Sequence, residues 1–276
     1  MSAAKKSNMI VEHLRRAQMQ ELLAEGKRLD GRGLTESRPI KIETNIIQKA
    51  NGSARVTLGN TQVIAGVKVS TDEPYEGLEN KGILICSAEV LPLASSYSEP
   101  GPPDEDAIEL ARVVDRGIRE SEMIDLTKLV LVEGKIVYAT FVDISILNIG
   151  GNLFDAASYA AVSALLTAKL PKLKMDDGKV VDTGELIPAP IRTVPVSVTM
   201  AKIGDAIIAD PASEEEAVMD GRITMTTDAE GNVCAVQKGG TGSFTVEQIH
   251  HVVDTAIAKG EEIRPMLKKV TENGSL

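Results

Sequence analysis

The pattern of hydrophobic and polar positions along the chain predicts a mixed fold of strands and helices. Short, largely apolar runs bounded by Gly, Pro, Asn or Asp are typical of strands, whereas longer segments with apolar residues three or four positions apart are typical of helices. The expected strands cover residues 39–47, 54–58, 62–69, 83–93, 135–147, 194–201, 205–209, 222–227 and 233–237. The expected helices cover residues 8–25, 105–121, 152–169 and 245–270.

Strands followed by a helix occur twice, which predicts an α+β fold with α/β layers. The two halves span about residues 28–170 and 190–272, and they pack as one unit within residues 1–276, because no linker between them is long enough to separate two domains. The almost continuously apolar run 135–147 is expected inside a sheet. Gly59-Asn60 predicts a hairpin turn.

The stretch from Glu99 to Arg119 combines a proline-rich entrance with an amphipathic helix. Asp104 follows the prolines at a position suited to a helix N-cap. At about 100° per residue, the apolar side chains gather on one side of the helix. The opposite side carries three arginines, Arg112, Arg116 and Arg119.

Periodicity alone leaves two interpretations of these arginines open. They can be solvated charges that pair with acidic residues three or four positions away, each pair contributing ~0.2–0.5 kcal/mol. Alternatively, Arg112 and Arg116 form a like-charged pair that an anion such as phosphate would stabilise. Charged runs on helices are usually solvated, which favours the first interpretation.

Composition restricts the kinds of partner that the chain can have. The net charge of −10 repels nucleic acid, so any RNA contact requires a local basic patch. Three Phe, four Tyr and no Trp argue against an RNA surface built mainly on base stacking. We find no signal peptide and no membrane-spanning stretch, so we expect a cytoplasmic protein without membrane contact.

Spacing alone assembles no active site. Cys86 and Cys234 lie singly within apolar runs, which predicts buried thiols, and the histidines lack metal-ligand spacing. Gly150-Gly151 and the glycine-rich segment 238–242 could cradle phosphate, although a tight turn and a loop explain them equally well. The acidic segment 210–220 could bind a divalent cation, but a solvated turn is favoured. We therefore expect no catalytic residue, no metal and no cofactor.

Several stretches taken together resemble the RNase PH family: residues 28–32 with Arg38-Pro39-Ile40, residues 52–61, and residues 99–119. With residues 126–129 and 209–211, the last stretch is similar to the non-catalytic ring subunits of archaeal exosomes. The resemblance covers essentially the whole chain. It implies an RNase PH-like fold of two duplicated βα halves, in a hexameric ring of three heterodimers with an active RNase PH-like partner and a cap of RNA-binding subunits.

Two positions depart from the pattern of active family members. Those members carry Asp-Gly-Gly-Thr-Arg at the strand-to-helix turn, and the resemblance implies that this arginine binds the attacking phosphate. Here the turn ends in Leu153, which has no donor for an anion. Glu216 stands where the resemblance places an aspartate general acid. Because phosphorolysis needs phosphate held in line with the scissile ester, loss of the clamp should abolish catalysis.

With this resemblance, Arg112 and Arg116 are expected to contact phosphates of single-stranded RNA near the partner's active site, with Arg119 as a third candidate. The chain would then be a non-catalytic exosome subunit that assists 3′–5′ RNA degradation. One alternative is an independently active, phosphate-dependent 3′–5′ exoribonuclease that uses Glu216. Another is a purely architectural ring member without RNA contact.

Overall fold

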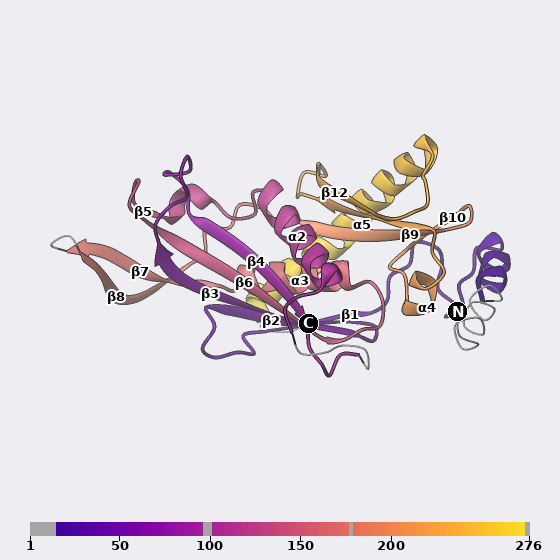
Figure 1. Ribbon diagram of the computed structural model, residues 1–276, viewed down its shortest axis with the longest axis horizontal. Helices are drawn as coiled ribbons and strands as arrows, with labels where there is room; N and C mark the ends of the chain where they lie inside the picture. The colour runs from indigo at the N-terminus through magenta and orange to yellow at the C-terminus, as the bar shows by residue number, and fades with distance from the viewer. Residues whose placement is uncertain (1–14, 96–100, 177–178, 274–276) are drawn as a thin grey trace.

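Two large β-sheets, with helices packed on them, form the computed structural model, which describes residues 15–95, 101–176 and 179–273 (Figure 1). The first sheet contains β1 (Ile40–Thr44), β2 (Gly52–Leu58), β3 (Thr61–Asp72), β4 (Ile83–Val90), β5 (Val130–Val132) and β6 (Ile136–Asn148). Its order is β1-β2-β3-β6-β4, with β5 also paired to β6. Only β4 runs parallel to its neighbour among the described strands. The prediction that the run 135–147 lies inside a sheet is confirmed.

The second sheet contains β9 (Val196–Ile203), β10 (Ala206–Ala209), β11 (Gly221–Thr227) and β12 (Val233–Gly240). Its order is β10-β9-β11-β12, and all its pairs are antiparallel. Both predicted hairpins of the second half are therefore confirmed. The hairpin at Gly59-Asn60 is also confirmed, with Leu58 paired to Thr61 and a φ of 56° at Gly59. A left-handed glycine at the first turn position matches the right-handed twist of the strands.

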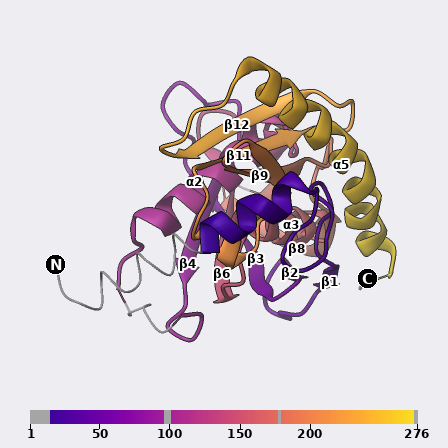
Figure 2. The same ribbon diagram turned by 90° about the vertical axis from the view of Figure 1, so that its right-hand side faces the viewer.

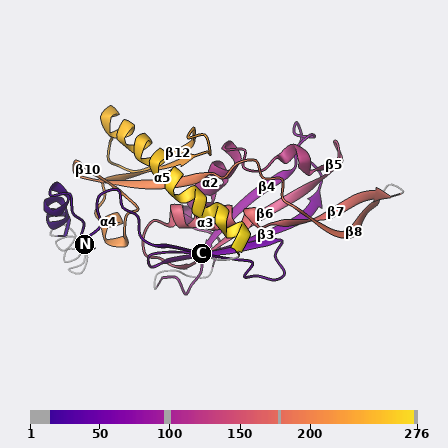
Figure 3. The same cartoon turned by 180° about the vertical axis from the view of Figure 1, so that it is seen from behind.

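The helices lie on both sides of the second sheet. α2 (Glu105–Glu120) and α3 (Leu153–Leu166) pack between the two sheets. α5 (Val246–Asn273) packs on β9 and β11, and Figure 2 shows it along the outside of the molecule. Its C-terminal turns continue towards α3 and β1 (Figure 3). The predicted layers of an α+β fold are confirmed.

Small side chains allow α3 to lie deep inside the molecule. Ala156, Ala157, Ala160, Ala161 and Ala164 are all 0% exposed. α2 approaches β11 equally closely, because a Cβ added at Gly117 would lie 3.1 Å from Oγ1 of Thr226. These close approaches place the start of α3 directly below the second sheet.

The segment between the two halves differs from the prediction. The helix expected over 152–169 ends at Leu166, and β7 (Lys169–Asp176) and β8 (Lys179–Pro188) then form a hairpin that projects from the body (Figure 1). Pro171 cannot continue a helix, and its carbonyl accepts a hydrogen bond of 2.8 Å from the hydroxyl of Tyr138. Two short helices were also not predicted, η1 (Leu126–Leu129) and α4 (Ser213–Glu216).

Three smaller predictions need correction or fall outside the structure. The loop expected over 238–242 is partly strand, because β12 continues to Gly240, which pairs with Gly221 of β11. Cys86 and Cys234 are half-buried rather than buried, since each lies on a strand with one open face. The predicted N-terminal helix is seen over 15–24, and its first residues lie outside the described ranges. The boundaries 28–170 and 190–272 stay a prediction.

Candidate functional site

α2 begins and is oriented as its sequence predicts. The Asp104 side chain accepts a hydrogen bond of 2.8 Å from the Ala107 backbone N–H, and this caps the helix. Leu110, Val114 and Ile118 are buried, so the apolar side faces the interior. The three arginines consequently point away from the core.

Arg112, Arg116 and Arg119 line one groove of about 600 Å³ between α2 and β4. The structure therefore brings together all three arginines that the sequence singled out. Leu84 and Cys86 of β4 line the other side of the groove. A row of guanidinium groups along a groove offers repeated contacts to a chain of phosphates.

The three guanidinium groups are engaged to different degrees. Arg119 donates to Asp115 at 2.7 Å and to the backbone carbonyl of Leu84 at 2.8 Å. The hydrogen bond to Asp115 raises the pKa of Arg119. Arg116 donates to Oε1 of Gln237 at 3.1 Å. Arg112 is exposed, and it has no hydrogen-bond or ion-pair partner within the described part of the chain.

An ion pair within α2 therefore neutralises only one of the three arginines. Asp115 neutralises Arg119, as the solvated interpretation expects. Glu109 instead bonds across to the second sheet, accepting from Arg222 at 2.7 Å and from Gln237 at 3.0 Å. This leaves Arg112 available for an external anion.

A second pocket, of about 180 Å³, lies at the start of α3. Leu153 and Glu216 face it, together with Phe154, Arg222 and Glu109. The strand-to-helix turn is tight, with φ of 90° at Gly151 and 49° at the capping residue Asn152. A Cβ at Gly151 would lie 2.5 Å from the Ser213 backbone nitrogen, so only glycine lets the turn pack against α4.

Glu216 occupies the anion-attracting end of α3. Its Oε1 accepts a hydrogen bond of 2.8 Å from the backbone N–H of Asn152. Burial raises the pKa of Glu216, although this hydrogen bond and the charges of Arg222 and Arg38 act in the opposite direction. The N–H that a phosphate would seek at this helix terminus thus already has a protein partner.

Arg222, the cation that lines this pocket, is also engaged. Nη2 of Arg222 forms an ion pair of 2.7 Å with Glu109. Its guanidinium also stacks over the ring of Phe154, with 4.4 Å between Cζ and the ring centroid. The pocket therefore offers little uncompensated positive charge to an anion.

The acidic segment 210–220 is not a solvated turn, so that prediction is wrong for most of it. Glu215 is 4% exposed and forms a double contact with Arg28, through Nε at 2.8 Å and Nη2 at 2.5 Å. Asp210 is 2% exposed and pairs with Arg32 at 3.0 Å and with Arg38 at 2.7 Å. These two acids neutralise the arginines at positions 28, 32 and 38, which belong to the stretches that resemble the RNase PH family. This role is not predictable from the sequence, because Arg28 and Glu215 lie 187 positions apart and Arg38 and Asp210 lie 172 positions apart.

Arg38 also reaches the turn before α3. Its Nη1 donates to the Gly150 carbonyl at 2.6 Å, and its Nη2 donates to the Gly151 carbonyl at 3.1 Å. The network of Arg28, Arg32 and Arg38 with Asp210 and Glu215 thus fixes the turn that forms the second pocket.

Residues 15–95, 101–176 and 179–273 contain no group of three or more His, Cys, Asp or Glu side chains arranged to hold a metal ion. Within the same ranges, no helix is both long enough and apolar enough to cross a membrane.

Comparisons with known proteins agree with this architecture. The exosome complex component Rrp42 of Thermococcus gammatolerans is 48% identical over 268 residues, which is 96% of this chain and 98% of that protein. A chain in the Archaeoglobus fulgidus exosome with RNA bound to the active site superposes with a TM-score of 0.87 at 44% identity, covering 94% of this chain and 100% of that one. A chain of an archaeal exosome core gives 0.83 at 42% identity, covering 94% and 98%.

The family models match most of the chain. Residues 36–171 match domain 1 of the 3′ exoribonuclease family, and residues 193–259 match its domain 2. The expected RNase PH-like fold is confirmed. On its sequence, its two domains and its fold, the chain belongs to the 3′ exoribonuclease family.

Proposed function

We propose that this chain is a non-catalytic subunit of an archaeal exosome, which degrades RNA in the 3′–5′ direction. In this role it structures the active site of a catalytic RNase PH-like partner and helps to bind single-stranded RNA. Its relatives, similar over almost their whole length, are exosome components. In the proposed assembly three heterodimers form a hexameric ring in the cytoplasm, and the ring carries RNA-binding cap subunits.

The composition of the turn before α3 is the observation that supports a non-catalytic role. Leu153 provides no donor at the position where active members carry an arginine. The Asn152 N–H is taken by Glu216, and Arg222 is paired with Glu109. A phosphate ion at this place would meet the carboxylates of Glu216 and Glu109, and the one cation of the lining, Arg222, is paired, so the ion could not be held for attack.

The arginine groove supports a role in positioning RNA. Among the residues that the structure describes, Arg112 has no hydrogen-bond or ion-pair partner, Arg116 has one hydrogen bond to a neutral side chain, and Arg119 is paired with Asp115. Guanidinium groups recognise phosphates without reading bases, so the proposed contacts are sequence-independent and weaken with salt. We rank Arg112 and Arg116 ahead of Arg119 as RNA contacts.

A phosphorolysis assay tests the non-catalytic role. The purified chain, mixed with oligoadenylate, inorganic phosphate and Mg²⁺, should release no ADP, and adding the catalytic partner should start release. The partner with a disabled active site serves as the control. ADP release by this chain alone would refute the proposal.

Charge reversal tests the RNA-binding role. The double variant Arg112→Glu with Arg116→Glu should weaken RNA binding by the assembled complex without preventing assembly. Lys27→Glu with Lys41→Glu is a matched control, because it changes the net charge equally at exposed sites remote from α2. Equal binding by the two double variants would favour a purely architectural subunit.

The alternative is an independently active, phosphate-dependent 3′–5′ exoribonuclease. One observation favours it: burial raises the pKa of Glu216, as a general acid requires. Turnover by the isolated chain that is lost in Glu216→Gln would establish this alternative.

A further inference from the structure

A third cavity, of about 240 Å³, opens beside the arginine groove. Its lining includes Tyr75, Leu78, Lys81, Leu84, Arg119 and Leu126. Three of these residues, Tyr75, Leu84 and Arg119, also line the arginine groove. The cavity and the groove are therefore adjacent, and the hydrogen bond of 2.8 Å from Arg119 to the Leu84 carbonyl lies between them.

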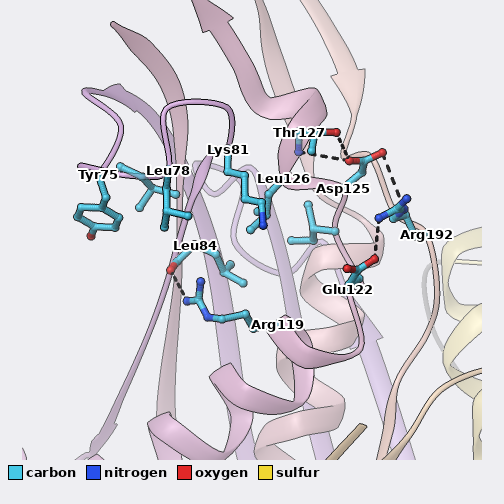
Figure 4. Close-up of a pocket in the computed structure, with 13 residues that line it drawn as sticks. Tyr75, Leu78, Lys81, Leu84, Arg119, Glu122, Asp125, Leu126, Thr127 and Arg192 are labelled. Atoms are coloured by element: carbon cyan, nitrogen blue, oxygen red, sulfur yellow. Dashed lines mark hydrogen bonds and ion pairs between the residues drawn. The ribbon is translucent and has the colours of Figure 1, made fainter. Parts of the chain in front are cut away.

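Tyr75 is an unusual side chain in this protein. It is 55% exposed, and no other aromatic side chain among the described residues is exposed to this degree. Figure 4 shows its ring at the edge of the cavity, beside Leu78, which lies between Tyr75 and Lys81 in this view. An aromatic face open to solvent beside a row of cations is the combination that binds unpaired nucleotides, because every base can stack on the ring.

The charges around the cavity are mixed, because Asp72, Glu73, Glu76 and Glu79 are exposed in the same segment as Tyr75. On the far side, Arg192 pairs with Glu122 at 2.8 Å and approaches Asp125 at 3.9 Å, so these charges largely cancel (Figure 4). Lys81 is exposed and forms no ion pair in the described ranges. The segment 72–81 thus carries one cation and four carboxylates, so attraction for RNA on this side comes from stacking on the ring and not from net charge.

The rest of the lining suits a base rather than a second phosphate. Leu84 is buried and forms an apolar wall, with Leu78 and Leu126 beside it. The Leu84 carbonyl, which could have read a base edge, already accepts from Arg119. The cavity therefore offers stacking and apolar contact without a fixed pattern of hydrogen bonds.

We propose that Tyr75 and this cavity form a seat for one unpaired nucleotide of single-stranded RNA. The base stacks on Tyr75 and packs against Leu78, while Lys81 contacts a neighbouring phosphate. The seat extends the RNA path from Arg112 and Arg116, so it rests on the proposed function. Because stacking tolerates every base, the seat retains RNA without selecting sequence.

Binding of a 5′-labelled oligoadenylate to the assembled complex, in phosphate-free buffer that prevents phosphorolysis, tests the seat. Tyr75→Ala should weaken binding about tenfold, whereas Tyr75→Phe, which keeps the aromatic face, should bind as the unchanged protein does. The same oligomer with abasic sites in place of its bases is the second probe. It should bind Tyr75→Ala and the unchanged protein equally.

The outcomes separate the seat from the proposed function. If Arg112→Glu with Arg116→Glu weakens binding of both probes but Tyr75→Ala weakens neither, the seat is wrong and the arginine contacts stand. If neither variant has an effect, the RNA-positioning role fails as well. If Tyr75→Ala prevents assembly with the partner, as size-exclusion chromatography would show, the cavity is a protein interface and the seat is refuted.

Discussion

The Glu216 carboxylate accepts a hydrogen bond of 2.8 Å from the backbone N–H of Asn152, the residue that caps α3. This carboxylate and an incoming phosphate would compete for the same N–H, because both are anions drawn to a helix N-terminus. The missing donor at Leu153 and the carboxylate of Glu216 are therefore two separate obstacles to phosphate binding.

Restoring only the guanidinium should not restore phosphate binding. In Leu153→Arg the new cation is expected to pair with Glu216, which lines the same pocket. The double variant Leu153→Arg with Glu216→Ala should bind inorganic phosphate measurably, by calorimetric titration of the isolated chain. Equal affinity in the single and double variants would show that Glu216 does not compete.

The arginines of the groove should contribute unequally to RNA binding. Arg112→Ala should weaken binding and reduce the slope of log K against log salt by about 0.7, the value for one phosphate contact on a single strand. Arg119→Ala should change binding less, because Asp115 and the Leu84 carbonyl already hold that guanidinium. Fluorescence anisotropy at several salt concentrations measures both quantities. A larger slope change for Arg119→Ala would reverse the ranking.

The buried pair of Arg28 and Glu215 should dominate local stability. Glu215→Ala leaves Arg28 without its double contact, so we expect a loss of about 3–5 kcal/mol in the free energy of unfolding. The neighbouring Glu214 is exposed, and Glu214→Ala should change stability by less than about 0.5 kcal/mol. Urea denaturation of both variants provides the comparison.

Replacing both partners of that pair distinguishes the cost of an unpaired buried charge from the cost of lost side-chain packing. Arg28→Met with Glu215→Leu removes the two charges together, so it should cost less than Glu215→Ala alone. A double variant as unstable as the single one would mean that packing, not the unpaired charge, sets the cost.

Asp210 should make stability depend on acid pH. Burial acts to raise its pKa, but the hydrogen bonds and charge of Arg38 hold the pKa of Asp210 below its ordinary value of 3.8. Its folded pKa is depressed, so its contribution is present above that ordinary value and is lost as the pH falls through the folded pKa. Denaturation curves from neutral to acid pH should therefore show a decline that Asp210→Asn reduces.

A matched carboxylate serves as the control for this pH effect. Asp205 is exposed in the turn between β9 and β10, so Asp205→Asn should leave the acid decline unchanged. If Asp210→Asn and the unchanged protein lose stability in parallel as the pH falls, Asp210 does not account for the decline.

Local signals made much of the fold predictable. Asp104 caps α2, and Thr245 and Gln248 form a capping box at the start of α5, with reciprocal hydrogen bonds of 3.0 and 3.2 Å. The β7–β8 hairpin is not predicted, because its strands are rich in Lys and Asp and contain Pro171, and only the short run 172–176 alternates between polar and apolar residues. Its pairing, including the Lys172–Glu185 bridge of 2.6 Å, becomes visible only in three dimensions.

The site was predictable where its contacts are local. The spacing of Asp115 and Arg119 indicated their pair, and the helix period placed the three arginines together. Glu215 was read as solvated because its partner, Arg28, lies 187 positions away in the sequence. The placement of Tyr75 beside the arginines likewise depends on the packing of β4 against α2, which no local pattern reports.

Arg38 contacts Asp210, after β10, and the carbonyls of Gly150 and Gly151, before α3, from a position just before β1. Opening either sheet would expose these buried charges, so the halves should unfold in one cooperative event. Backbone amides in β2 and β9 should then exchange with deuterium at a common free energy. Even a subunit without catalytic activity would therefore need these polar residues in order to fold.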